Sequence, residues 1–445
     1  MRTRRFLIII VGASATLGSS IVSAGSQAEE ADTAERLDVV DEIIAETMAR
    51  DYDLSLDEAR RRTLEQDHYD ELVLPIRTAV GYSAWGGSWI DHEHGGTMIV
   101  HLKRGADLKA ADEFQAVVSD EEIEVRQVEY SLEDLDNVVE QVKERIQPPD
   151  VYVDPVSNEV VVGVPEKTAE EAQGVAARLD GLPVRLEYGA APPIEVACGG
   201  YLHVCDQHLR GGVEIAAAST VTPGVLSLCT GGLVVKSNSD AKRFLITAGH
   251  CLRDANGSYW VSADSAGTYI WIGLQHQRPG WASPWLVTSS HDVGMIYMSD
   301  PMISLVSDTR VLVAASGGNT PTTRNEWYDI NGVGFASNLN SSSYLCYSGS
   351  VSKTECSQFV SANGNFVTMK VVDFGAAVCQ GDSGSPVYKN NKAYGMVQSI
   401  TLPTQTQTWQ TYLLGFVTPQ CVGYNGTWKY YSMSVALSQT NTTIM

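Results

Sequence analysis

Apolar and polar side chains alternate with two different spacings along the chain, and the change falls near Ala190. Between residues 29 and 71 apolar positions recur about every 3.6 residues, which predicts helices, with one face formed by Val39, Ile43, Ile44 and Met48. Beyond Ala190, short runs of Val, Ile, Leu, Tyr and Thr are separated by Gly, Ser and Asn. That pattern predicts a β-barrel or sandwich, with strands at Leu228–Val235, Phe244–Ala248, Thr268–Leu274, Val293–Met298, Asn325–Phe335, Phe366–Val372, Pro386–Val397 and Tyr412–Val417.

The stretch between these regions repeats an arrangement of strands and helices. After a strand at residues 97–102, Ser131 and Asp134 form a capping pair for a helix, and its apolar stripe is Leu135, Val138, Val139, Val142 and Ile146. A strand at residues 158–164 precedes a second helix that begins at Thr168. The similar strands 125–130 and 183–188 accompany the two helices. The repetition predicts an α/β segment, and no catalytic set is visible in it.

Charge and cysteine both divide the chain near residue 197. The net charge of −22 is concentrated in residues 25–197, which hold 40 Asp plus Glu against 15 Lys plus Arg, whereas residues 198–445 hold 13 of each sign. The lack of a basic excess argues against nucleic-acid binding. All eight cysteines lie at Cys198 or later, which predicts disulfides formed in an oxidising compartment. Free thiols or a metal site are the alternatives, but no Cys-x-x-Cys pair favours a metal.

The first 24 residues have the pattern of a secretory signal peptide. Arg2, Arg4 and Arg5 precede an apolar run, and Val22-Ser23-Ala24 resembles a signal-peptidase site. The apolar run is shorter than the roughly 20 residues that a membrane span needs. We therefore expect a secreted, extracellular protein without a stable membrane anchor, an uncleaved anchor being the alternative.

Three short motifs in the sheet-rich half carry candidate chemistry. His250 ends the run Leu245-Ile246-Thr247-Ala248-Gly249-His250-Cys251, Asp292 opens a strand, and Ser383 lies in the glycine-flanked turn Gln380-Gly381-Asp382-Ser383-Gly384-Ser385-Pro386. A serine hydroxyl becomes a nucleophile when an imidazole takes its proton, and a buried carboxylate can orient that imidazole. The N–H groups of Gly381 and Ser383 are the expected donors to an oxyanion. Each motif alone is more often a turn or a core feature, whereas the three in this order predict a Ser-His-Asp triad.

In that order the motifs resemble those of the chymotrypsin-like serine proteases, and most closely the secreted actinobacterial streptogrisin and α-lytic-type branch. Thr-Ala-Gly-His-Cys and Gly-Asp-Ser-Gly-x-Pro are specific to the family, and Cys346 with Cys356 resembles a disulfide loop of that branch. The resemblance implies a double β-barrel protease domain at residues 198–445. It also implies that residues 25–197 are a pro-region that assists folding and inhibits the mature enzyme.

The family resemblance also implies disulfides and a substrate pocket. The implied pairs are Cys229–Cys251, Cys346–Cys356, Cys379–Cys421 and Cys198–Cys205. The residue six before the nucleophile, Ala377, stands at the base of the primary pocket in the family, and Val378, Gln398 and Ser399 are its expected neighbours. Because none of these is charged, we expect apolar or aromatic side chains to be preferred at the cleavage site, or smaller ones if the pocket is narrowed.

Two departures from the family pattern bear on activation. Ser385 stands where a second glycine is usual, and we expect the turn to accommodate it. No Ile-Val-Gly-Gly start is visible, so activation by a new N-terminus beside Asp382 is not expected, and a structural role is predicted for Asp382.

The sequence therefore predicts a serine endopeptidase that acts on protein or peptide substrates without a cofactor or metal. An inactive relative that binds protein and a hydrolase of esters are the alternatives. A permanent second domain is the alternative to a removable pro-region.

Overall fold

The computed structural model describes residues 37–108, 110–120, 123–146, 148, 150–164, 169–188, 194–195, 210–217, 228–240, 242–254, 259–263, 269–298, 309–314, 325–372, 378–401, 412–413, 416–417 and 426–445. Residues 37–445 form one compact unit, and the predicted signal peptide lies outside the described residues. None of the helices in the described ranges combines the length and hydropathy that a transmembrane span requires.

Two helices open the described chain. Helix α1 (Val39–Asp51) begins at Asp38, whose carboxylate accepts from two backbone N–H groups of the first turn, and α2 (Leu56–Val80) begins at Ser55. The predicted helices are present, but α2 continues nine residues past residue 71. The most buried side of α1 contains Val40 together with Ile44 and Met48, whereas Val39 and Ile43 are only partly buried.

The α/β segment is a duplication, with a different repeating unit from the predicted one. Each half consists of an antiparallel strand pair, a helix, and a third strand parallel to the second. The first half contains β1 (Trp85–Asp91), the short η1 (His92–His94), β2 (Thr97–Lys103), α3 (Ala111–Asp120) and β3 (Ile123–Val128). The second half contains β4 (Asp150–Asp154), β5 (Glu159–Val164), α5 (Ala169–Arg178) and β6 (Val184–Tyr188).

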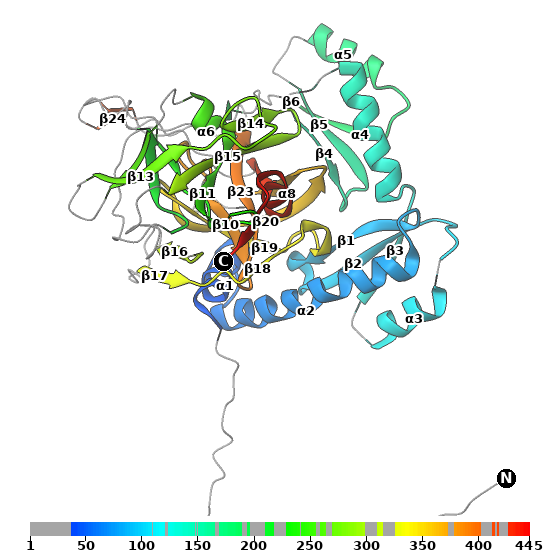
Figure 1. Ribbon diagram of the computed structural model, residues 1–445. Helices are drawn as coiled ribbons and strands as arrows, with labels where there is room; N and C mark the ends of the chain where they lie inside the picture. The colour runs from blue at the N-terminus through cyan, green and yellow to red at the C-terminus, as the bar shows by residue number, and fades with distance from the viewer. Residues whose placement is uncertain are drawn as a thin grey trace, which may run out of the picture. The chain divides into compact units, whose positions relative to one another are not determined.

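Helix α4 (Leu132–Ile146) connects the halves, so it is not the repeated helix that the sequence suggested. Its predicted capping pair is present: Ser131 Oγ accepts from the N–H of Asp134, and Asp134 Oδ2 accepts from the N–H of Ser131. Its apolar stripe packs against the valines of β4 and β5 (Figure 1). The predicted start of α5 at Thr168 lies outside the described residues.

The sheet-rich half contains two large sheets. The first has the order β27-β10-β11-β15-β13-β12-β8-β9, with β14 paired to β15. Its strands are β8 (Glu214–Ala217), β9 (Leu228–Thr230), β10 (Val234–Ser237), β11 (Arg243–Thr247), β12 (Tyr259–Ala263), β13 (Tyr269–Gln275), β14 (Trp285–Thr288), β15 (His291–Met298) and β27 (Thr442–Ile444).

The second sheet closes on itself. Strands β23, β22, β19, β20, β21 and β26 pair in that order, and the β23–β26 pair completes the ring. Their bounds are β19 (Tyr344–Gly349), β20 (Lys353–Asn363), β21 (Phe366–Lys370), β22 (Pro386–Lys389), β23 (Lys392–Thr401) and β26 (Thr427–Ser432); β18 (Gly332–Val333) and β7 (Ile194–Glu195) pair with β23.

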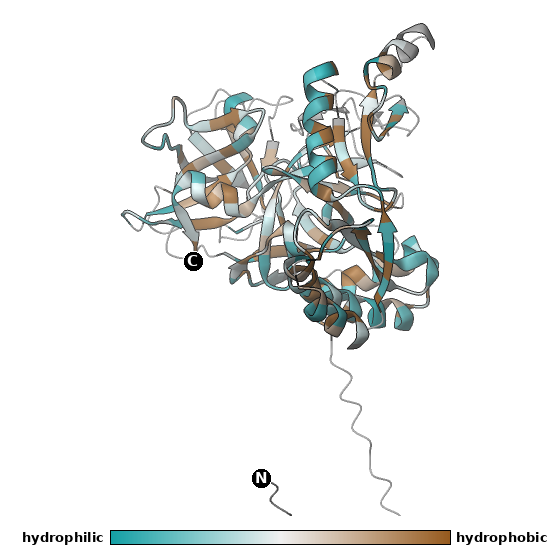
Figure 2. Cartoon of the chain, turned by 90° about the vertical axis from the view of Figure 1, so that its right-hand side faces the viewer, coloured by the Kyte–Doolittle hydropathy of each residue, from teal (hydrophilic) through white to brown (hydrophobic). Residues whose placement is uncertain are grey.

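Smaller elements complete the described chain. They are α6 (Gly249–Asp254), the hairpin β16 (Val311–Ala314) and β17 (Asn325–Tyr328), η3 (Ala336–Asn338), the pair β24 (Tyr412–Leu413) and β25 (Phe416–Val417), and α8 (Met433–Thr440). Hydrophobic residues concentrate on the strands, as Figure 2 shows by colour, and each large sheet has its own buried cluster.

All eight predicted runs contain strands, but four of them are two strands each: β9 with β10, β17 with β18, β22 with β23, and β24 with β25. The breaks lie where the chain turns, for example at Asn390 and Asn391, which both adopt positive φ. The sheet-rich half also contains two short helices, α6 and α8, which the strand pattern did not predict.

Candidate active site

The first sheet positions His250 beside Asp292. Strand β11 ends at Thr247 and pairs with β15 so that Thr247 lies opposite Gly294. His250 follows in α6, and Asp292 is the second residue of β15. Gly249 permits the close approach, because a Cβ there would lie 2.8 Å from the backbone N and O of Val293.

The turn that carries Ser383 is attached to both sheets. The N–H of Thr230 in β9 donates to the carbonyl of Ser383 at 2.8 Å, and the N–H of Gly384 donates to the carbonyl of Val397 in β23 at 2.8 Å. Ser383 therefore lies where the two sheets meet, next to the end of β11.

The three predicted side chains form a hydrogen-bonded row. Asp292 Oδ2 is 2.8 Å from His250 Nδ1, and His250 Nε2 is 2.8 Å from Ser383 Oγ. The other carboxylate oxygen of Asp292 accepts from the backbone N–H of His250 at 2.9 Å. With Nδ1–H donating to Asp292, Nε2 is an acceptor for the serine proton, which is the tautomer that general-base chemistry requires.

Gly381 gives the serine turn its shape. Its φ of 106° lies in a region that side chains disfavour. Its carbonyl accepts from the hydroxyls of Thr230 at 2.8 Å and Ser350 at 3.0 Å. These two hydroxyls fix the orientation of the Gly381–Asp382 peptide, and the sequence analysis identified neither of them.

Asp382, for which the sequence suggested no partner, accepts from backbone N–H groups. Oδ2 accepts from Cys379 at 2.7 Å, and Oδ1 accepts from Val351 at 3.0 Å and Ser352 at 3.2 Å. Burial raises the pKa of Asp382 to about 6, against the lowering effect of these hydrogen bonds. The carboxylate thus ties the serine turn to the β19–β20 connection. Ser385 adopts no left-handed backbone, so its side chain fits where a glycine was usual.

Disulfides flank the site. Cys229–Cys251 and Cys346–Cys356 are formed, as the resemblance implied. Cys379 is disulfide-bonded, while Cys421, Cys198 and Cys205 lie outside the described residues.

The expected pocket residues lie on the closed barrel. Val378 is fully buried, Ser399 is buried and Gln398 is half-buried, while Ala377 lies outside the described residues. Val378 shares its apolar cluster with Val397, Ile400 and Trp428. The sequence analysis did not single out Trp428, because its place beside β23 depends on the β23–β26 register, in which Trp428 lies opposite Ile400.

The candidate nucleophile is covered. Ser383 and His250 are both 0 % exposed. The short strand β7 pairs antiparallel with β23, with Ile194 opposite Ile400 and Glu195 opposite Ser399. Residues just before the predicted pro-region boundary thus occupy the edge of a strand that carries two of the expected pocket residues.

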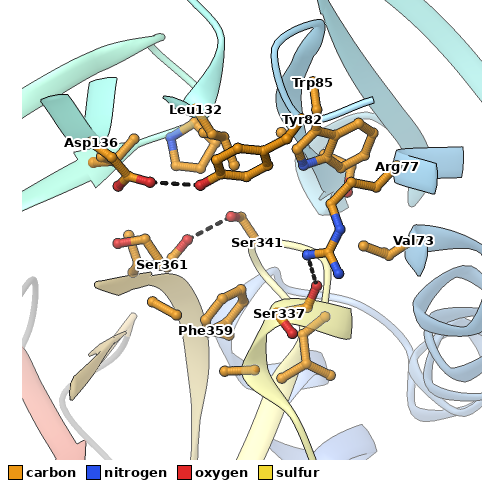
Figure 3. A pocket seen from close by; sticks show the side chains of 18 residues that line it. Val73, Arg77, Tyr82, Trp85, Leu132, Asp136, Ser337, Ser341, Phe359 and Ser361 are labelled. Atoms are coloured by element: carbon orange, nitrogen blue, oxygen red, sulfur yellow. Dashed lines mark hydrogen bonds between the residues drawn. The ribbon is translucent and has the colours of Figure 1, made fainter. Parts of the chain in front are cut away.

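A separate cavity of about 120 Å³ lies away from this row (Figure 3). Its lining includes Arg77, which donates to the carbonyl of Ser337, and Tyr82, which donates to Asp136. None of the three side chains of the row lines this cavity, so it is not the candidate active site.

Comparisons with known proteins gave one match to a family model and several matches to solved structures. A family model described as Trypsin matches residues 213–419, and no curated protein matches the chain. A solved structure titled for a glutamic acid specific serine protease with a histidine triad in substrate binding is 17% identical, covers 53% of this chain and 100% of that chain, and has a TM-score of 0.35. The structure of Thermobifida fusca protease A is 16% identical, covers 54% of this chain and 98% of that chain, and has a TM-score of 0.30. The structure of Cellulomonas bogoriensis chymotrypsin is 14% identical, covers 54% of this chain and 98% of that chain, and has a TM-score of 0.31.

Proposed function

We propose that the chain is a serine-type endopeptidase, because its residues 213–419 match the family model described as Trypsin, and that Ser383, His250 and Asp292 are its catalytic triad. The fold is the predicted one, chymotrypsin-like with two β-barrel sheets preceded by a segment of helices and strands. The observation that carries the proposal is the continuous row from carboxylate to hydroxyl, with both contacts at 2.8 Å.

The row supports hydrolysis through an acyl-enzyme. Ser383 Oγ attacks the peptide carbonyl carbon while His250 Nε2 takes its proton. The tetrahedral intermediate then expels the amine, which receives that proton from His250. A water molecule, deprotonated by the same imidazole, cleaves the ester and restores Ser383. Asp292 stabilises the imidazolium in both halves of the reaction, and no cofactor is required.

The N–H groups of Gly381 and Ser383 are the proposed oxyanion donors. The hydroxyls of Thr230 and Ser350 hold the carbonyl of Gly381, and so the Gly381–Asp382 peptide that lies between the two donor peptides. The peptide that carries the Ser383 N–H is held by its own carbonyl, that of Asp382, which accepts from the N–H of Ser385 at 2.9 Å. Donors fixed before the reaction stabilise the developing charge without reorganisation, and one such donor contributes roughly 3 kcal/mol to transition-state stabilisation.

A fluorophosphonate probe tests the triad. We expect the processed wild-type protein to be labelled, Ser383→Ala to be unlabelled, and Ser385→Ala, two residues along the same turn, to keep its label. Casein digestion by the wild type distinguishes a peptidase from an esterase. A folded wild-type protein that is not labelled would contradict the triad and favour an inactive, protein-binding relative.

We also propose that the protein is made as a secreted preproenzyme of the bacterial branch with a pro-region. Residues 1–24 are the signal peptide, residues 25–197 the pro-region and residues 198–445 the protease domain. The disulfides support an oxidising, extracellular location. The burial of Ser383 and the pairing of β7 with β23 support a segment that blocks substrate access until it is removed.

A neutral primary pocket completes the proposal. Val378, Val397 and Trp428 form an apolar wall, and burial of apolar surface favours binding by about 25 cal/mol per Å². Apolar residues at the cleavage site are therefore preferred over Lys and Arg. The chain's own boundary fits this preference, because residues 189–197 contain no Lys or Arg.

A further inference from the structure

A lysine is buried on the closed barrel, six residues after Ser383. Lys389, the last residue of β22, is 1% exposed. Its ammonium lies 2.7 Å from Asp67 Oδ1 and 2.8 Å from Asp70 Oδ2, and both carboxylates belong to α2. Burial alone would lower the pKa of Lys389, and the carboxylates of Asp70 and Asp67 raise it above its ordinary value. The lysine is therefore charged, and its charge is compensated only by the N-terminal segment's acidic residues among the ion pairs of the described chain.

Asp70 is the centre of the contact. Its Oδ1 accepts from the backbone N–H of Asn340 at 2.9 Å, from the Asn340 side-chain amide at 3.2 Å and from the hydroxyl of Ser343 at 2.7 Å. Its Oδ2 accepts from Lys389. Four donors from three separate positions of the protease domain thus converge on one carboxylate that is 8% exposed.

In three neighbouring contacts the N-terminal segment likewise accepts hydrogen bonds that the protease domain donates. The N–H of Tyr344 donates to Gln66 at 2.8 Å, and its hydroxyl donates to Asp51 at 2.7 Å. The hydroxyl of Tyr328 donates to Asp38 at 3.1 Å. In these contacts the protease domain supplies the donors and the acidic segment supplies the acceptors, whereas Arg77 and Ser88 of the segment donate in the opposite direction, to Ser337 and Asn340. The carboxylates of Asp38, Asp51 and Asp70 thus have specific partners in the protease domain.

We infer that Lys389, Asn340 and Ser343 form a carboxylate-binding site on the protease domain, and that Asp70 on α2 of the chain's own N-terminal segment is its ligand. This inference rests on the proposed function, because it assigns the site a role only if the segment is cut and later released. The cut segment stays bound through Asp70, and its release exchanges the four hydrogen bonds of that carboxylate for hydrogen bonds to water. Hydrogen bonds to charged groups contribute more to stability than bonds between neutral groups, so their loss opposes release and the site prolongs inhibition after the cut.

The full-length, self-processing chain tests the site. Release of the cut segment is followed as the lag before cleavage of a chromogenic peptide begins, with the bound segment detected by size-exclusion chromatography. We expect Asp70→Asn and Lys389→Met each to shorten the lag by about tenfold or more. The double variant should be no faster than the faster single variant, because both remove the same contact. Asp57→Asn, an exposed carboxylate on the same helix, should keep the wild-type lag.

Failure of the proposed inhibitory function and failure of the carboxylate site would give different results. A wild-type chain that is fully active at the moment of cutting, with no bound segment, contradicts the proposed inhibitory function. A segment that stays bound but is released equally fast from Asp70→Asn and wild type overturns the carboxylate site alone.

Amine acylation gives a second measurement that does not depend on those variants. The uncut Ser383→Ala precursor and the separated wild-type protease are treated with acetic anhydride and analysed by mass spectrometry. Lys389 should be protected in the precursor and modified in the separated protease, whereas Lys392, exposed three residues away, should be modified in both. Modification of Lys389 in the precursor to the extent of Lys392 overturns the inference.

Discussion

Trp428 is fully buried against Val378, Val397 and Ile400, and this packing bears on substrate choice residue by residue. In the proposed pocket the indole would occupy space that a substrate side chain would otherwise fill, and smaller apolar side chains would be favoured. A lysine or arginine would have to bury its charge beside this apolar wall. Because burying an ion without a partner costs several kcal/mol, we expect such a pocket to disfavour basic substrates.

The prediction at this scale is a ratio of rates. For peptides that differ only at the cleavage site, kcat/KM for Leu or Val should exceed that for Lys or Arg by about 100-fold or more. The measurement is initial-rate kinetics with the processed enzyme, and peptides with Ala at the same position serve as the neutral reference. Cleavage dominated by Lys or Arg would show that the wall is not part of the pocket.

At the scale of elements, η1 contains a buried histidine, His92, that makes the stability of the folded chain depend on pH. His92 is 3% exposed, and its Nε2 lies 3.3 Å from the carbonyl of Ser342 in the protease domain. The imidazole ring of His92 contacts the rings of Tyr52 and Tyr344. The guanidinium of Arg62 donates to the backbone carbonyl of His92. The pKa of His92 is lowered to about 4 by burial first and by the charge of Arg62, against the raising effects of Ser342 and Asp91.

The sign of the effect follows from proton binding. Between pH 6.5 and about 4 the unfolded chain binds a proton at His92 that the folded chain does not, so stability falls as the pH falls through this window. Within this window each pH unit changes the free energy of unfolding by about 1.4 kcal/mol. The Ser383→Ala precursor should therefore lose roughly 3 kcal/mol from this group between pH 7 and 4, measured by urea unfolding.

Two variants isolate this contribution. His92→Gln should remove that part of the pH dependence, and His94→Gln, an exposed histidine of the same element, should not. Asp41 opposes the trend, since burial and then Asp38 and Asp67 raise its pKa to about 7, but it is common to all three proteins. Parallel pH curves for the wild type and His92→Gln would contradict the prediction.

At the scale of the whole molecule, the order of assembly becomes important. The second barrel closes through the pairing of β23 with β26, and sheets with such non-local pairings fold slowly. Helix α1 packs its apolar side into the same buried cluster as Tyr344 and Tyr388 of the barrel. We therefore expect the N-terminal segment to stabilise barrel strands before the ring is complete.

Refolding measures this contribution. Ser383→Ala should accumulate as an uncut precursor and refold from urea, whereas the separated protease should refold at least about tenfold more slowly unless the segment is added back. Recovery of activity with time is the measurement for the active enzyme, and intrinsic fluorescence is the measurement for the variant. Equal rates with and without the segment would leave the folding role without support.

The sequence was most informative where the chemistry is local. His250 and Ser383 lie in short motifs whose turns need particular residues, and the capping pair of Ser131 and Asp134 is equally local. Contacts set by tertiary structure could not be read in this way. Two of the three donors to Asp382, the N–H groups of Val351 and Ser352, lie some 30 residues earlier, and the partners of Lys389 lie more than 300 residues earlier. The repeat unit was misassigned because α4 has the clearest apolar stripe although it only joins the halves.

The pairing of β27 with β10 has a consequence for biosynthesis. Residues 442–444 lie beside residues 235–237, so β10 lacks one neighbour until about 200 further residues have been translated. Until then β10 is an open edge, and open edges recruit strands from other chains. Nascent chains that stall or terminate before Thr442 should therefore self-associate, so translation of residues 442–444 removes a site of aggregation.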